Sequence, residues 1–309
     1  MNKPYISVVI TAHNRTEFLM DAINSVLGQT LNRTLYEIIV VKNFYDPGID
    51  DFLNRKGIIN LKSRESSLLG EDIALGVENA KGEVLSFLDD DDQFYPQKLE
   101  HVYKMFRENK RIVYYHNNYS AINEKKQPIK FNNGSIDFNM SCITVRKKII
   151  HKDKISKIEY LPDTFMYYSA VDYGGKVISD KLKLTRYTLH NSASFILDEK
   201  FDNSIDKKIN LQRKHIETLS NYLVLFKSEK VKRKINAYIT GLNIYSFIFR
   251  NLEKPKKIYN FLVHGDNPKS YRIILLGAYI LVLISPNYLR KYVFKKYEQI
   301  YTKELAQLM

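Results

Sequence analysis

The stretch Glu83-Val84-Leu85-Ser86-Phe87-Leu88-Asp89-Asp90-Asp91-Asp92 decides the fold and marks a candidate site. Its first six residues form a short and largely apolar run, which is typical of an internal strand of a parallel sheet. Four aspartates follow this run without a break. Because ligands of open α/β sheets bind beyond the carboxyl ends of the strands, the sequence predicts a binding site at residues 89–92.

Elements of an α/β fold precede this stretch. Residues 5–10 and 37–41 are predicted to be two buried strands, and apolar residues recur at helical spacing over 18–27 between them. A strand, a helix and a parallel strand form a βαβ unit. Asn14 is predicted to cap the helix, and Glu17 to close a capping box.

The pattern continues through the next hundred residues. A short strand is predicted over 58–61, a helix over 70–80, a helix that opens at Pro96 and a strand over 112–115. The sequence therefore predicts an α/β fold, in which a mostly parallel, Rossmann-like sheet is flanked by helices.

The character of the chain changes after Phe201. Residues 205–250 show long helical periodicity and contain many lysines. We place the boundary near 198–204. The sequence therefore predicts an α/β domain over residues 1–200, followed by a basic α-helical domain over 201–309.

The four aspartates favour a metal site. Consecutive carboxylates repel one another, and they lose hydration beside an apolar strand. A divalent cation offsets both costs, and Mg²⁺ or Mn²⁺ suits oxygen ligands while leaving coordination positions for phosphate oxygens. A solvated acidic loop is the simpler alternative. The adjoining residues Ser86, Phe87 and Leu88 argue against it.

The formal charge of +14 over 309 residues is unusual. Nucleic acid, an anionic membrane surface and a phosphate-bearing substrate all attract such a charge, and a basic surface shared by a whole proteome would produce it without any partner. The lysines are spread through the helical part, whereas the predicted site is acidic. We therefore expect no nucleic-acid partner.

The single cysteine and the N-terminus both bear on location. Cys142 alone excludes an internal disulfide framework and any Cys-based zinc site, and it fits a reducing compartment. Residues 1–4 run directly into a strand pattern without the apolar segment of a signal peptide. We expect a cytoplasmic protein.

An apolar run covers residues 273–284. It is shorter than the roughly 20 residues that a membrane-spanning helix needs. Two interpretations stay open, a buried core helix and a helix that lies in the membrane interface. Tyrosines and basic residues over 288–297 support the second, which would place the protein peripherally on the cytoplasmic face of the membrane.

Three segments together resemble glycosyltransferase family 2, which has the GT-A fold. They are residues 7–15, 37–41 and 80–92, in this order and spacing: Ser7-Val8-Val9-Ile10-Thr11-Ala12-His13-Asn14-Arg15, Glu37-Ile38-Ile39-Val40-Val41, and Ala80-Lys81-Gly82-Glu83 with Phe87-Leu88-Asp89-Asp90-Asp91-Asp92. The resemblance covers roughly residues 4–195. It implies an inverting transferase that moves a sugar from a nucleotide-diphosphate sugar to a hydroxyl of a lipid-linked or cell-surface glycan.

The resemblance also implies roles for individual residues. Asp89 and Asp91 would form the DxD pair that binds the donor and holds Mn²⁺ or Mg²⁺, and Asp90 would reach the ribose. The metal would neutralise the leaving diphosphate as a Lewis acid. The first loop would contact the donor base with Thr11, Ala12, His13 and Asn14.

Two positions depart from the family pattern. The family usually carries a pair of aspartates after the second strand, where this chain has Lys42-Asn43. Asn43 can still hydrogen-bond a base as donor and acceptor, so the identity of the base stays open. The helix before the DxD pair usually carries an Asn or Arg toward the donor. In the stretch over 70–76, Asp72 is the polar candidate besides Glu71.

An inverting transferase needs one general base to deprotonate the acceptor hydroxyl. In the family this base is an acidic residue near the start of a helix well after the DxD pair, and Asp163 has that placement. An ordinary helix cap is the alternative for Asp163. Asp172 is the second candidate for the base.

Residues 184–194 resemble the segment that closes the family's catalytic domain. Arg186 and His190 are candidates to reach the diphosphate, and His190 is also a candidate metal ligand, although a structural role for this histidine is equally open.

Two other functions compete with this prediction. A nucleotidyltransferase should have a glycine-rich basic loop after its first strand, and residues 11–14 contain no glycine. A non-catalytic nucleotide-binding scaffold would keep the fold without the chemistry. The four aspartates and Asp163 argue against a scaffold, whereas Lys42 and Asn43 keep it open.

Overall fold

The structure is a computed structural model that describes residues 3–129, 139–189, 201–250, 256, 258–266, 269–284 and 291–299. His190 and residues 198–200 lie outside the described residues. Contacts divide the chain into two compact units, an α/β unit of residues 1–122 with 138–188 and a helical unit of residues 123–137 with 189–309.

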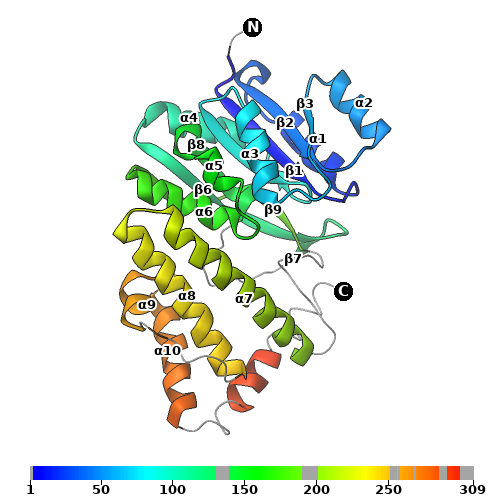
Figure 1. Ribbon diagram of the computed structural model, residues 1–309. Coiled ribbons are helices and arrows are strands. Elements are labelled where there is room, and N and C mark those ends of the chain that lie inside the picture. Colours follow the sequence, from blue (N-terminus) through cyan, green and yellow to red (C-terminus); the bar gives the residue numbers. More distant parts are fainter. Residues whose placement is uncertain are drawn as a thin grey trace. The chain divides into compact units, whose positions relative to one another are not determined.

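One mixed sheet forms the centre of the α/β unit (Figure 1). Its strand order is β3-β2-β1-β4-β8-β6-β9-β5, and β7 pairs with β6. The pairs β1–β2, β1–β4 and β2–β3 are parallel, and β4–β8, β6–β8 and β5–β9 are antiparallel. The strands are β1 (Ile6–Ala12), β2 (Tyr36–Lys42), β3 (Ile59–Lys62), β4 (Val84–Asp89), β5 (Gln93–Phe94), β6 (Ile112–Asn123), β7 (Pro128–Ile129), β8 (Ile143–Arg146) and β9 (Lys176–Leu189).

Helices cover both faces of the parallel strands. The helices of this unit are α1 (Leu19–Leu27), α2 (Pro47–Arg55), α3 (Leu69–Asn79), α4 (Lys98–Glu108), α5 (Lys152–Ile155) and α6 (Pro162–Tyr173), with 3₁₀ turns at Arg33–Leu35, Met140–Cys142 and Lys147–Ile149. Alternate residues of β1 point to opposite faces. Val8 and Ile10 join the core that α1, α2 and α4 complete, whereas Val9 meets α3.

The contact with α3 explains a glycine in that helix. A Cβ added at Gly76 would lie 2.5 Å from Val9 Cγ1 and 3.3 Å from Val41 Cγ2. Any larger residue would therefore push α3 away from the sheet, and the first turn of α3 carries Asp72. The small residue thus fixes one predicted site residue against the strands.

Two local predictions were wrong. α1 begins at Leu19, and neither Asn14 nor Glu17 caps it, because Asn14 adopts a left-handed backbone (φ 54°) and bonds to Asn43 instead. The helix after Pro96 begins at Lys98. One helix, α2, was not predicted. Its start is conventional, with Asp46 as N-cap accepting from Ile49 N at 2.9 Å and Pro47 in the first turn.

The helical unit contains long helices, as the periodicity predicted. They are α7 (Phe201–Leu225), α8 (Glu229–Arg250), α9 (Ile258–His264) and α10 (Lys269–Ile284), and residues 291–299 are also helical. Buried apolar residues of α7, α8, α9 and α10 form one core. At the α8–α9 contact, a Cβ added at Gly241 would lie 2.9 Å from the Phe261 ring, so a glycine is needed there as well.

α10 has two apolar faces. Leu275, Tyr279 and Val282 are buried in the core of the helical unit. The opposite face is exposed and carries Ile273 (65% exposed), Ile274 (71%), Ile280 (45%), Leu281 (45%) and Ile284 (75%). We call these five residues the α10 apolar face. The prediction of a buried core helix is thus confirmed for one side of α10, and the prediction of a membrane-interface helix stays a prediction for the exposed side. Within the described residues, no helix is both long and apolar enough to span a bilayer.

Candidate active site

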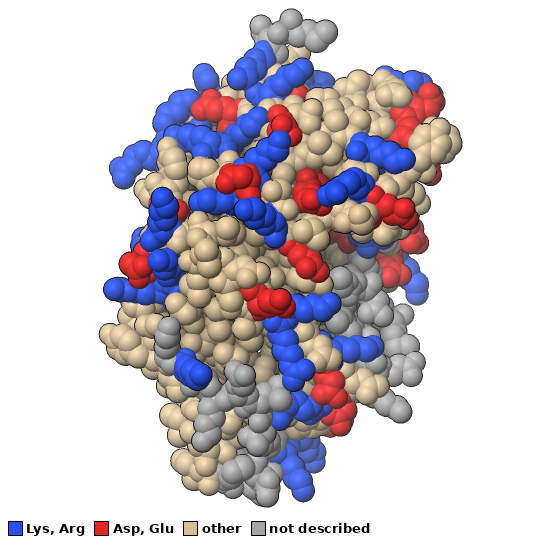
Figure 2. All heavy atoms as spheres, in the orientation of Figure 1, with Lys and Arg blue, Asp and Glu red and all other residues tan. Residues whose placement is uncertain are grey.

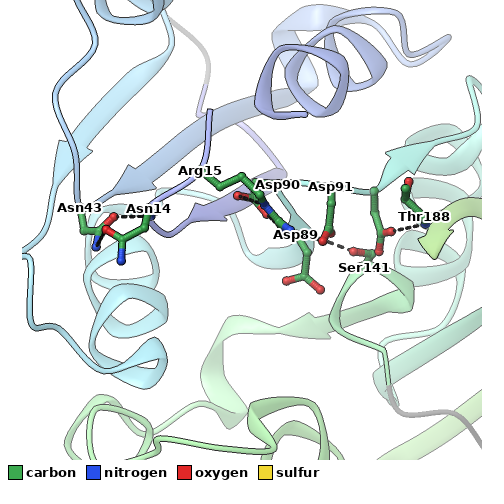
Figure 3. Close-up of polar contacts among 9 residues, drawn as sticks. Asn14, Arg15, Asn43, Asp89, Asp90, Asp91, Ser141 and Thr188 are labelled. Atoms are coloured by element: carbon green, nitrogen blue, oxygen red, sulfur yellow. Dashed lines mark hydrogen bonds and ion pairs between the residues drawn. The ribbon is translucent and has the colours of Figure 1, made fainter. Parts of the chain in front are cut away.

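Three parallel strands end at the same edge of the sheet and bring the predicted site residues together. In register, Thr11 of β1 lies beside Val41 of β2 and Asp89 of β4. The polar segments that follow these strands therefore meet at one edge, as the α/β pattern predicted. Figure 3 shows Asn14 and Asn43 on one side of this site, Asp89, Asp90 and Asp91 in the centre, and Ser141 and Thr188 on the other side.

The acidic cluster (Asp89, Asp90, Asp91 and Asp92) is not a solvated loop. Asp90 is 5% exposed and Asp92 is fully buried. Asp92 Oδ1 accepts the backbone N–H of Thr188 at 2.9 Å, and Asp89 N donates to Ser141 Oγ at 3.0 Å. The cluster is thus held by two segments distant in sequence, the 3₁₀ turn at Met140–Cys142 and strand β9.

Arg15 binds the cluster from the first loop. Its guanidinium pairs with both carboxylate oxygens of Asp90, and its Nη2 lies 2.6 Å from Asp91 Oδ2. Although burial lowers the pKa of Arg15, the hydrogen bonds and charges of Asp90 and Asp91 raise it overall. A planar guanidinium matches two carboxylates in this way through charge-assisted hydrogen bonds.

The arginine does not neutralise the whole cluster. Burial and the charges of Asp91, Asp90 and Asp163 raise the pKa of Asp89 well above its usual value, and Arg15 opposes this shift. Burial and the same kind of repulsion raise the pKa of Asp92, while hydrogen bonds from Ser141 and Thr188 oppose it. The site therefore favours an additional positive charge, either as protons or as a cation.

The first loop and the end of β2 form a polar group beside the cluster. Asn43 is 5% exposed; its Oδ1 accepts Asn14 N at 2.8 Å, and its Nδ2 donates to Asn14 Oδ1 at 2.9 Å. His13 joins them, with Nε2 3.4 Å from Asn43 Nδ2 and Nδ1 3.8 Å from Asp72 Oδ2. The structure thus brings together His13, Asn14, Asn43 and Asp72.

Lys42 and Asp72 differ in what their buried polar atoms contact. Lys42 Nζ lies 2.7 Å from Asp50 Oδ1 and donates to Phe44 O at 2.8 Å, so this lysine is held within the fold. Asp72 is 1% exposed, and among the described atoms its Oδ1 has no hydrogen-bond partner. A buried carboxylate oxygen of this kind is a candidate acceptor for a ligand N–H or O–H group.

Asp163 lies in the first turn of α6, and its charge acts on Asp89. The N-cap of α6 is Leu161, whereas the Asp163 carboxylate accepts Thr164 N at 2.5 Å. Leu161 has a left-handed backbone (φ 60°), a conformation that costs a non-glycine residue roughly 1–2 kcal/mol. This strained turn sets the direction in which α6 starts, and hence where Asp163 points. Asp172 is exposed near the other end of α6, about 13 Å further along the helix at 1.5 Å per residue.

The residues present fit a divalent cation bound together with a ligand. Within the described ranges, no three His, Cys, Asp or Glu side chains converge as a complete metal site. Mg²⁺ at phosphate sites usually takes one or two carboxylates and completes its shell with phosphate oxygens and water. Asp89 and Asp91 could supply two such carboxylates, in a cluster where the pKa values of Asp89 and Asp92 are raised by burial and by neighbouring carboxylates.

Comparison with known proteins places this arrangement in a family. The model of "Glycosyl transferase family 2" matches residues 7–170, which contain the acidic cluster, the first loop and Asp163. The chain belongs to glycosyl transferase family 2.

Individual relatives are similar over part or most of the chain. An uncharacterised glycosyltransferase of Rickettsia conorii is 34% identical over 137 residues, or 42% of this chain. Those residues are 22% of the Rickettsia protein, so this chain matches about a fifth of that relative's length. The poly(ribitol-phosphate) β-N-acetylglucosaminyltransferase TarP of Staphylococcus aureus is 23% identical over 285 residues, covering 90% of this chain and 79% of TarP.

Solved structures show the same fold. TarS of S. aureus matches with a TM-score of 0.56 at 14% identity, covering 84% of this chain and 47% of TarS. TarS 1–349, solved in complex with UDP-GlcNAc, matches with a TM-score of 0.55 at 13% identity, covering 79% of this chain and 73% of that one. The fold is thus the GT-A fold with a helical region after it.

The remaining predicted residues of this family 2 protein are spread more widely. Ala12 is buried at the end of β1, and Thr11 is partly exposed beside it. Arg186 is exposed on β9, where it pairs in register with Gln93 and stacks on the Tyr95 ring at 4.8 Å. His190 lies outside the described residues, so its assignments to the metal and the diphosphate stay predictions.

Sequence reasoning assigned no role to three residues that organise the site. Arg15 stood in the quoted motif and could have been paired with the aspartates by charge. Ser141 and Lys98 gave no signal, because they reach the cluster through contacts that span 43–52 residues of sequence.

Proposed function

We propose that this protein is an inverting, metal-dependent glycosyltransferase, which moves a sugar from a nucleotide-diphosphate sugar to the hydroxyl of an acceptor glycan. One observation carries the proposal: Asp163 lies where its charge acts on Asp89. A candidate base in the first turn of α6 thus interacts electrostatically with a candidate diphosphate site, and an inverting displacement requires such a pairing.

Each residue of the site has a role in the proposed reaction. Asp163 accepts the proton of the acceptor hydroxyl, Asp90 binds the ribose, and Arg186 is the cation for the diphosphate. Asp89 and Asp91 would hold Mn²⁺ or Mg²⁺, which would supply Lewis-acid neutralisation of the leaving group. His13, Asn14, Asn43 and Asp72 bind the base, with Thr11 and Ala12 forming the floor beside it.

A uridine diphosphate sugar is the first donor to test. TarS was solved with UDP-GlcNAc, and TarP is named for N-acetylglucosamine transfer. Asn43 bonds to Asn14 through both Oδ1 and Nδ2, and an exchange of these bonds would let it pair with the N3–H and a carbonyl of uracil.

The acceptor in this proposal is a lipid-linked glycan, reached from the membrane surface. Residues 201–309 contain 20 Lys and Arg against 8 Asp and Glu, a formal charge of +12, which attracts anionic lipid. The α10 apolar face offers five large side chains for insertion between lipids. Residues 291–299 add exposed Lys291, Lys295 and Lys296 with Tyr292 at 60% exposure, a combination typical of interfacial segments.

Figure 2 shows one face of the molecule, on which uncharged residues predominate over α9 and α10. A location on the cytoplasmic face of a membrane follows from this proposal, together with peripheral attachment rather than a span.

Thermal unfolding in the presence of ligands tests the donor site. UDP-GlcNAc, UDP-glucose, GDP-mannose, CMP-sialic acid and dTDP-rhamnose, each with Mn²⁺, with Mg²⁺ and with EDTA, should divide into one class of base that raises Tm and others that do not. Metal-dependent stabilisation by one class, followed by turnover of that donor, supports the proposal. No stabilisation by any of them contradicts it.

Flotation on vesicles tests the membrane contact. Binding to vesicles that contain phosphatidylglycerol, and not to phosphatidylcholine vesicles, is the expected result. A protein that stays unbound and sediments as a defined oligomer would show instead that a second copy covers the α10 apolar face.

A further inference from the structure

Lys98 is a buried lysine under the acidic cluster. It is the first residue of α4, six residues after Asp92, and its side chain is fully buried. Lysines are almost never buried completely unless they have a specific partner. The surroundings of this amine therefore need an explanation.

The amine is held by three groups. Its Nζ donates to Ser141 O and, at 3.2 Å, to Thr185 Oγ1, and it lies 3.8 Å from the centre of the Phe94 ring. Thr185 Oγ1 itself donates to Ser141 O at 3.0 Å. Two of the three contacts thus converge on the backbone of Ser141.

Ser141 connects this amine to the acidic cluster. Its Oγ accepts the backbone N–H of Asp89 at 3.0 Å, and its hydroxyl lowers the pKa of Asp92 by hydrogen bonding. Lys98 therefore holds the backbone of Ser141, and the side chain of Ser141 in turn holds Asp89 and Asp92. The contact chain runs from helix α4 through the Met140–Cys142 turn to the end of β4.

This arrangement is unfavourable for stability alone. Burial lowers the pKa of Lys98 to about 7, while the charges of Cys142 and Asp92 oppose this shift. The fold thus penalises the ammonium form of this side chain near neutral pH. A methionine would fill the same space without a charge to desolvate, and uncharged residues of similar volume often replace buried charges without loss of stability.

We propose that Lys98 is a positioning residue for the donor site, which acts through Ser141 to hold the acidic cluster in the orientation that binds a nucleoside diphosphate with its metal. The inference rests on the proposed donor site. It assigns to Lys98 no contact with the donor.

Lys98→Met separates positioning from a structural role. The variant should keep or raise the Tm of the ligand-free protein, and its Kd for the nucleotide should rise by about tenfold, the lower end of what residues behind a metal site contribute. The probe is UDP with Mn²⁺, measured by calorimetric titration. GDP, ADP and CDP are measured in parallel, and whichever the wild type binds is used throughout.

Two further variants complete the test. Ser141→Ala should weaken nucleotide binding about as much as Lys98→Met, and the double variant should lose little more than either single one, because both break the same chain of contacts. Lys104→Met is the control, since Lys104 lies on the same helix but is exposed and pairs with Glu100. It should change neither Tm nor Kd.

The outcomes distinguish this inference from the proposed function. If wild type binds none of the four nucleotides with Mn²⁺ or Mg²⁺, the proposed donor site is wrong. If wild type binds and Lys98→Met binds equally well, Lys98 has no positioning role. A Lys98→Met protein that fails to fold would indicate a structural role, and unchanged binding by Ser141→Ala would then overturn the inference.

Discussion

The two units of this protein use charge in opposite ways. Residues 1–200 contain 28 Lys and Arg against 26 Asp and Glu, and residues 201–309 contain 20 against 8. In the α/β unit the positive and negative charges nearly balance, and several of them form specific ion pairs. These pairs are Arg15 with Asp90 and Asp91, Lys42 with Asp50, and Arg146 with Glu83. Over residues 201–309 basic residues outnumber acidic ones by more than two to one.

In the proposed function, the two parts of the chain would recognise their partners in different ways. A site built from placed charges binds a ligand of defined shape, and single residues decide its affinity. An excess of one sign over a helical surface attracts an extended anionic partner, and its contribution falls with ionic strength. Variants in the α/β unit should therefore have large effects on chemistry, and variants in the helical unit small and additive effects on location.

The largest expected effect is that of Asp91→Ala. Turnover should fall by more than about a thousandfold, because the variant lacks one of the two carboxylates that would hold the metal in the proposed site. Turnover is measured by release of the nucleoside diphosphate, and circular dichroism checks the fold. Asp51→Ala is the matched control, because Asp51 is exposed and pairs with Arg55. Equal activity of the two variants would overturn the site assignment.

Asp163→Asn should lower kcat by about a hundred- to ten-thousandfold while the KM for the donor changes little, because a general base acts on the acceptor proton. Steady-state kinetics at saturating donor measures this separation. Asp172→Asn, at the far end of the same helix, should leave kcat unchanged. A loss of activity only in Asp172→Asn would move the base to that residue.

Removal of apolar area from α10 tests the proposed membrane contact of the helical unit. Ile273→Ser with Ile280→Ser should weaken binding to anionic vesicles by about tenfold or more, since each isoleucine contributes roughly 1.5–3 kcal/mol when it is fully buried. Flotation measures this binding. Val224→Ser, at an 86% exposed position on α7, is the control. Turnover with a soluble acceptor should not change in either protein.

A further effect is on stability and depends on pH. The folded-state pKa of Lys98 is about 7, below its ordinary value of 10.5, so between these values the unfolded chain holds a proton that the folded protein lacks. Wild-type stability should therefore rise with pH through this window, by at most about 1.4 kcal/mol per pH unit from this group. The advantage of Lys98→Met should be largest below pH 7 and should disappear toward pH 10.5. Denaturant unfolding at several pH values measures it, and a constant difference would contradict the assignment.

Much of the fold followed from the sequence, because buried strands are short apolar runs whose carboxyl ends must share an edge. The placement of Thr11, Asn43 and Asp89 at that edge needed no more than this rule. The cap of α1 was wrong because a long-range bond to Asn43 outweighs the local preference of Asn14. Lys98 and Ser141 were missed for a related reason: their partners lie in other elements, and spacing along the chain does not show which turn will pack beneath a strand.

The helical unit shows the limit of periodicity. The run over 273–284 is apolar all round, so its sequence could not distinguish the side that packs on α8 and α9 from the side that faces outward. Packing decides which side is buried. The ring centre of Phe247 on α8 lies 5.3 Å from that of Tyr279, so the side of α10 that carries Tyr279 packs in the core of the helical unit.

The clamp of Arg15 on Asp90 and Asp91 has a consequence for the order of binding. In the proposed function, a divalent ion that binds Asp91 Oδ2 would displace the Arg15 guanidinium, which would then lose this ion pair unless another anion replaced the carboxylate. The diphosphate of the donor is such an anion, so the ion and the nucleotide should each increase the affinity of the protein for the other, by the same factor. If the proposed function holds, Arg15 would make the acidic cluster a poor site for free metal ions and a good one for a metal that binds together with its nucleotide.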